Sequence, residues 1–135
     1  MEKEDLLLKD VLESESKISL KKLFQLRTNI WKCWMISGEG GSWSQFSDLE
    51  QNLSSFKAFN LIPTAIEICM EQEDPDLFDT ALSLLCSLVT ASNTTEIPVI
   101  FKEKWAQIIT KAEELKSDSH QGLINHIESW YRINQ

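Results

Sequence analysis

The spacing of apolar residues constrains the fold of this chain more than any other feature. Apolar side chains recur three and four residues apart in nearly every segment of the 135 residues, which is the period of a helix that buries one face. Only four Gly and three Pro interrupt the pattern, whereas a β-sandwich needs a turn signal about every 8–12 residues. The sequence therefore predicts an all-α protein.

Capping residues place the expected helix boundaries. Asp74-Pro75 is the clearest start, an N-cap followed by Pro at the first helical position. The helix that follows, with apolar residues from 77 to 89, is the most apolar and is expected to be central. Asn60 is expected to cap the helix before it, with Pro63 tolerated in the first turn. Thr95 is expected to cap a further turn that contains Pro98.

Two boundaries are less sharply defined by the sequence. Residues 47–50 have the Ser-x-x-Glu spacing of a capping box, and a start nearer Ser44 is the alternative. A break near residues 102–104 is expected in the helical stripe that runs from Ile97 to Leu115. The helix that begins at this capping box is expected to be the third of the chain, and its inner face is expected to carry Phe46, Leu49, Leu53 and Phe56.

About seven helices with short connections predict one domain over residues 1–135. Its expected architecture is a compact right-handed helical bundle or a short superhelix of the armadillo or HEAT type. Residues 59–91 carry this prediction, because a helix, an acidic cap with proline and a more apolar helix form one unit that buries its face only against neighbours. The length gives a chain that can build its core without a metal or disulfide staple.

The charge is unevenly distributed along the chain, whose net charge is −8. Residues 17–37 carry a net charge of +5, and residues 38–96 carry −9. An acidic chain is poorly suited to nucleic acid, which is bound mainly by neutralising phosphates, so we expect no direct nucleic-acid binding. No stretch of 18 or more apolar residues is present, so we expect no membrane span, and the acidic first residues lack the basic region of a signal peptide.

Catalytic and metal-binding signatures are weak. The three cysteines, Cys33, Cys69 and Cys86, lie in apolar helical patterns and are expected to be reduced core residues. His120 and His126 lie six residues apart and do not share a helix face. We expect no enzyme activity, no metal and no cofactor.

Three stretches of the C-terminal half resemble the N-terminal domain of transcription elongation factor TFIIS, also called the LW domain. Residues 84–88, followed by Thr94-Thr95, are similar to the Leu-rich helix of that family and the threonine-opened turn after it. Residues 105–111 are similar to its penultimate helix, and Ile124-x-x-Ile127-x-x-Trp130 to its closing Leu-Val-x-x-Trp signature. The resemblance covers residues 60–135, and residues 1–59 only in the number of helices. The layout is closest to that of the nuclear targeting subunit of protein phosphatase 1.

The resemblance implies a function that composition and spacing do not. Members of the family are docking modules rather than enzymes, and they capture short disordered motifs or a folded partner. It therefore implies a nuclear protein–protein docking domain of transcription or RNA-processing machinery, a protein phosphatase 1 complex included. The alternative is an armadillo or HEAT scaffold segment, or a dimerisation segment, of a cytoplasmic assembly.

Four residues are the candidate protein-binding site. Residues 17–37 are expected to form a helix, and Lys17, Lys21 and Lys32 are spaced to share the face opposite its apolar residues. Trp43 lies in a Gly/Ser stretch that has no helical pattern. A short acidic disordered motif with an aromatic or aliphatic anchor would suit such a surface, because charges steer the encounter and the anchor holds. The alternatives are a solvated lysine face and a Trp43 that folds back over the core.

Overall fold

The computed structural model describes the backbone of residues 3–37, 46–116 and 120–133, and the side chains of these residues except 29–37. Within these ranges the chain forms seven helices and no strand, which confirms the all-α prediction. They are α1 (Lys3–Ser14), α2 (Lys17–Ser37), α3 (Ser47–Asn52), α4 (Ser55–Glu71), α5 (Pro75–Ser92), α6 (Val99–Leu115) and α7 (His120–Tyr131).

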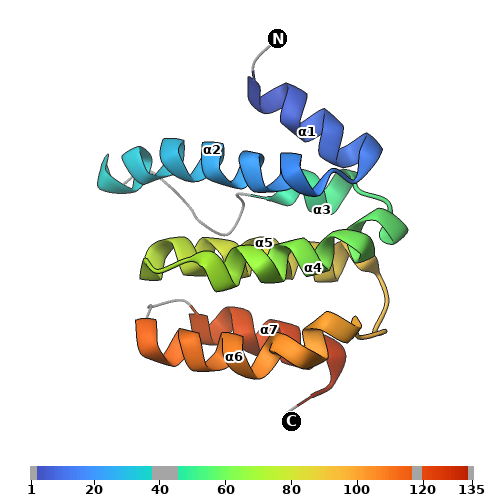
Figure 1. Cartoon of the computed structure of the whole chain (residues 1–135), viewed down its shortest axis with the longest axis vertical. Helices are drawn as coiled ribbons and strands as arrows, with labels where there is room; N and C mark the ends of the chain where they lie inside the picture. Colours follow the sequence, from blue (N-terminus) through green and yellow to red (C-terminus); the bar gives the residue numbers. More distant parts are fainter. Residues whose placement is uncertain (1–2, 38–45, 117–119, 134–135) are drawn as a thin grey trace.

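Six of the helices form three stacked pairs. In Figure 1, α2, α4 and α6 lie one below another, and α5 and α7 lie behind α4 and α6. Helix α4 packs on α2 and on α6, while α5 packs on α3 and on α7. The layers are therefore α2 with α3, α4 with α5, and α6 with α7, and α1 covers α2 at one end. This is the layering of helix pairs that residues 59–91 predicted.

Contacts between the helices show which of them run parallel and which antiparallel. Helices α5 and α7 are parallel, because Cys86, Thr90 and Thr94 contact Leu123, His126 and Trp130 in turn. Helices α6 and α7 are antiparallel, because Phe101 packs on Tyr131 and Trp105 donates to Glu128. Helix α4 runs parallel to α2, as the Glu15–Asn60 and Lys21–Glu67 contacts show.

The core is centred on α5, as expected. Its buried residues include Phe78, Leu82, Leu85 and Leu88, and the helix packs on α2, α3, α4, α6 and α7. Asp74 accepts a hydrogen bond from the backbone N–H of Leu77 at 3.0 Å, and Pro75 is the first helical residue, so this predicted boundary is confirmed. Helix α5 therefore has neighbours in every layer.

Other predicted boundaries are wrong. Helix α4 begins five residues before Asn60, with Ser54 as its N-cap, so Pro63 lies in the helix interior and not in its first turn. The Asn60 side chain instead donates to Glu15 at 2.7 Å. This contact spans 45 residues and leaves no trace in local spacing.

The ends of α3 and α6 also differ from the expectation. The N-cap of α3 is Phe46 without a side-chain cap, so residues 47–50 do not form the capping box. Helix α6 is continuous through residues 102–104 and begins after Pro98, and Thr95 caps no helix. Phe56, expected on an inner face, is 72% exposed because it belongs to the first turn of α4 rather than to α3.

Candidate functional site

The predicted basic face on α2 lies next to acids of the same chain. Lys17 is exposed in the first turn of α2. Lys21, one turn later, lies 3.2 Å from Glu71 and 3.3 Å from Glu67 of α4. Hydrogen bonds to Glu71 and Glu67 raise the pKa of Lys21. The acidic groups that the sequence assigned to a partner are thus supplied to Lys21 by α4.

The other two predicted residues lie outside the description. The side chain of Lys32 and the whole of Trp43 are not among the described residues. The structure therefore places Lys17 and Lys21 on the same side of α2 and leaves the four-residue surface a prediction.

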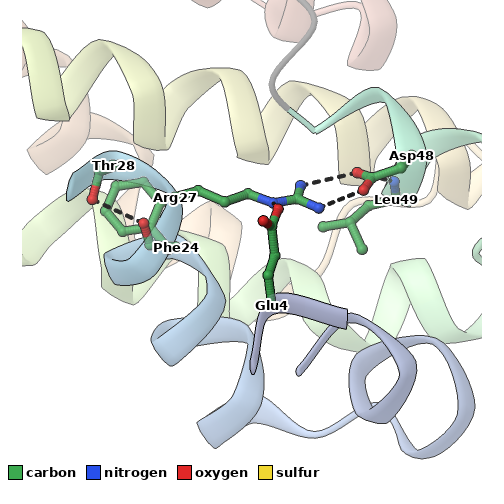
Figure 2. A network of polar contacts seen from close by, with 6 residues as sticks. All are labelled: Glu4, Phe24, Arg27, Thr28, Asp48 and Leu49. Carbon is green, nitrogen blue, oxygen red and sulfur yellow. Dashed lines mark hydrogen bonds and ion pairs between the residues drawn. The ribbon is translucent and has the colours of Figure 1, made fainter. Parts of the chain in front are cut away.

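Another cation of α2, Arg27, is buried. Arg27 donates from Nε to Glu4 of α1 at 2.7 Å and from Nη1 to Asp48 of α3 at 3.0 Å, with a second hydrogen bond to Asp48 from Nη2 (Figure 2). Its guanidinium also lies 5.6 Å from the ring centroid of Phe46. Burial lowers the pKa of Arg27, but the hydrogen bonds to Asp48 and Glu4 outweigh burial and raise it. Arg27 therefore joins three helices and is a structural group rather than a binding residue.

An apolar groove lies on α6. It has a volume of about 300 Å³ and is lined by Ile97, Phe101, Lys102, Trp105, Ala106, Ile109 and Ile133. Phe101 and Trp105 form its base, because their rings stack at 4.6 Å and are almost fully buried. Glu128 of α7 holds the Trp105 indole through a 3.1 Å hydrogen bond from Nε1.

This groove is on the side of α6 that faces away from α4. Lys111 marks the α4 side, because its ammonium donates to the Met70 carbonyl at 2.7 Å and pairs with Glu73. Ile109 and Lys102 lie about 160–200° around the helix from Lys111, at about 100° per residue. In Figure 1, α4 lies above α6, and the groove belongs to the opposite side of α6, which is the outer face of the last layer.

A second, more polar groove lies at the edge between α4 and α6. It has a volume of about 450 Å³, and its walls include Met70, Glu73, Gln107, Lys111 and Glu114. Lys111 and Glu73 already pair with each other at 3.3 Å across it. Ala106 is exposed and lines both grooves, so one position on α6 gives access to the two of them.

The remaining reactive groups are placed unfavourably for chemistry. Burial raises the pKa of the Cys69 thiol well above its ordinary value and that of Cys86 to about 12, which disfavours the nucleophilic thiolate. Cys69 and Cys86 are free and buried, as predicted, and the side chain of Cys33 lies outside the described residues. In the described ranges no three His, Cys, Asp or Glu side chains come together as metal ligands. No helix among the described residues is long and apolar enough to cross a bilayer.

Comparison with known proteins adds no relative. No family model, curated protein or solved structure shows significant similarity to this chain. The resemblance to the TFIIS N-terminal domain therefore rests on the three stretches of sequence alone.

Sequence reasoning missed the α6 groove because it assigned all the apolar residues of this segment to the core. The available signal was the width of the stripe. Ile109 falls about 80–100° to one side of the buried Phe101 and Ile108 around α6. A stripe wider than one contact surface indicates a helix with a second apolar contact.

Proposed function

We propose that this chain is a non-enzymatic protein-docking module whose docking surface is the outer face of the α6–α7 layer. The observation that carries the proposal is the apolar groove built on Phe101 and Trp105. A rigid aromatic base of this kind suits an interface, since binding energy concentrates in desolvated pockets near aromatic anchors. The acidic balance of the chain supports a protein partner over nucleic acid.

The cellular setting belongs to the same proposal and has a narrower basis. Nuclear transcription or RNA-processing machinery, including a protein phosphatase 1 complex, follows from the resemblance of residues 84–88, 105–111 and 124–130 to the LW domain. The scaffold or dimerisation alternative is favoured by a different observation, the stacking of helix pairs, which is how armadillo and HEAT arrays are built.

The test compares cross-linked partners of three versions of the chain in cells that have been fractionated into nucleus and cytoplasm. Ala106→Arg places a long cation in both grooves. Gly122→Arg is the matched control, because a Cβ added at this α7 position meets nothing within 4 Å. We expect nuclear partners that wild type and Gly122→Arg share and Ala106→Arg loses, and each must then bind the purified chain directly. An identical set from all three versions contradicts docking on α6, and a cytoplasmic set favours the scaffold alternative.

A further inference from the structure

We propose that the occupant of the apolar α6 groove is an amphipathic helix of a partner protein with a carboxylate at one edge of its apolar face. This inference rests on the docking function proposed above and names the partner that the groove fits. Its starting point is the way in which the chain fills the equivalent surfaces between its own layers.

The middle layer of this molecule is covered on both sides. Helix α2 covers one side of α4, and α6 covers the other, with α4 and α2 running parallel. Within the described residues α6 is covered by α4 on one side only, and the apolar groove lies on the opposite side. A helix laid on this side would continue an interface that the fold already uses twice.

The positions that line the groove match a helical partner. Phe101, Trp105 and Ile109 follow one another at intervals of four residues, so the floor of the groove runs along α6 for about 12 Å. A groove that follows this spacing accepts the side-chain ridge of another helix. A partner with apolar residues at i, i+3 or i+4, and i+7 would place about two turns against them.

The lysine at the rim of the groove predicts where the partner helix carries a carboxylate. On both sides of α4 a lysine pairs with glutamates: Lys21 of α2 with Glu67 and Glu71 of α4, and Lys111 of α6 with Glu73, two residues after the end of α4. Lys102 lines the open groove, is exposed, and forms no ion pair with another described residue. Repetition of the same pattern places an Asp or Glu of the partner opposite Lys102, where it adds specificity more than affinity.

The experiment selects the occupant from a display library built on a single-helix scaffold with one face randomised. The purified wild-type chain is the target, and a synthetic copy of each enriched peptide is the probe for titration. We expect the enriched peptides to share apolar residues at helical spacing with an Asp or Glu at one edge. We expect Lys102→Glu and Ile133→Asp each to weaken binding at least tenfold, and Gln107→Glu, which changes only the polar groove, to leave it within twofold.

A charge exchange separates direct contact from damage to the fold. A peptide whose edge carboxylate is replaced by Lys is expected to bind Lys102→Glu at least tenfold better than it binds wild type, which a misfolded variant could not do. Circular dichroism of each variant checks that the helices are retained. Failure of the exchange, with Lys102→Glu binding both peptides equally, overturns the assigned edge.

The remaining outcomes overturn the inference in distinguishable ways. If the selected peptides bind in an extended conformation and still lose affinity for Ile133→Asp, the docking function stands and the helical partner is wrong. Binders indifferent to both groove variants, or no binder at all, reject this groove as a helix site, while the cross-linking comparison above still judges the docking function. If light scattering shows a concentration-dependent dimer and Ile133→Asp is a monomer, the occupant of the groove is a second copy of this chain and not a partner helix.

Discussion

At the scale of single residues, Arg27 is the polar group on which the packing of the first three helices depends most. Its side chain is only 5% exposed, while its partners Glu4 and Asp48 are about a third exposed. Removing one member of a buried ion pair costs about 3–5 kcal/mol, and partial exposure of the partners reduces this figure. We expect Arg27→Ala to lower the free energy of unfolding by about 2–3 kcal/mol in urea denaturation. Arg27→Lys is expected to recover part of it, because it keeps the charge and loses the two-point contact with Asp48. Equal stability of Arg27→Ala and wild type would show that the network contributes nothing net.

Tyr131 is a second residue with a testable consequence. Its ring packs edge-on against Phe101, and its hydroxyl is buried with no hydrogen-bond partner among the described residues. An unsatisfied buried polar group costs about 1–3 kcal/mol. We therefore expect Tyr131→Phe to raise the free energy of unfolding by about 1 kcal/mol, and a loss of stability would show that the hydroxyl has a partner.

The same residue predicts a response to alkaline pH. Burial raises the pKa of Tyr131 from 10.0 to about 12. Because the folded-state pKa is the higher one, this contribution to stability is complete below pH 10 and is lost as the pH rises towards 12. Wild type is expected to lose stability between pH 10 and 12, and Tyr131→Phe to lose less. Burial also raises the pKa values of Cys69 and Cys86, and these thiols add a loss of the same sign that begins near pH 9 in both proteins, so the difference between the two curves reports Tyr131. Parallel curves for the two proteins would contradict the assignment.

At the scale of helices, the sequence predicts what is set by neighbours in the chain. Asp74 and Pro75 define the start of α5 because cap and helix are adjacent. The start of α4 could not be predicted in this way. Asn60 and Pro63 have the composition of a helix start, but Ser54 caps the helix and Asn60 serves α1 through Glu15. The neighbour of Trp130 could not be predicted either. Its indole donates to the Thr94 carbonyl, beyond the C-cap of α5, because the register of parallel α5 and α7 is a tertiary property.

Hydrogen bonds from Lys57 attach the C-terminal end of α1 to α4. Lys57 of α4 donates to the carbonyls of Leu12 and Glu13 at 3.1 and 2.9 Å, so a cation caps the C-terminal end of α1. We expect Lys57→Met to cost about 1 kcal/mol. Amide exchange in residues 3–14 should then be about fivefold faster, while exchange in α5 stays nearly unchanged. Lys102→Met, at an exposed lysine of α6, is the control that should alter neither. Uniformly faster exchange in all helices would show that Lys57 stabilises the whole fold and not α1.

At the scale of the whole molecule, the sequence predicts the stacking of helix pairs but not its open surfaces. The acidic cap and apolar helix of residues 59–91 are local, so the repeated unit could be recognised. The pairing of Lys21 with Glu67 and Glu71 joins α2 to α4 and removes Lys21 from a free basic face. The α6 groove exists only because no described helix covers that side. Both features follow from which layers meet, and a single sequence does not specify this by spacing.

The layered arrangement also predicts how the molecule unfolds. Leu85 of α5 and Val11 of α1 are both fully buried, but α5 contacts helices in every layer, whereas α1 packs mainly on α2. In stacked helical arrays each unit is stabilised by its neighbours, and terminal units open first. We expect Leu85→Ala to cost about 3–5 kcal/mol, a large part of the total of about 5–15 kcal/mol for a domain, and to speed amide exchange in all the helices. Val11→Ala should cost about 2 kcal/mol and speed exchange in residues 3–14 far more than elsewhere. Hydrogen-exchange mass spectrometry of the two variants measures both patterns. If Leu85→Ala speeds exchange in α5 alone, or Val11→Ala speeds it equally in all the helices, the layers do not depend on α5 as their contacts indicate.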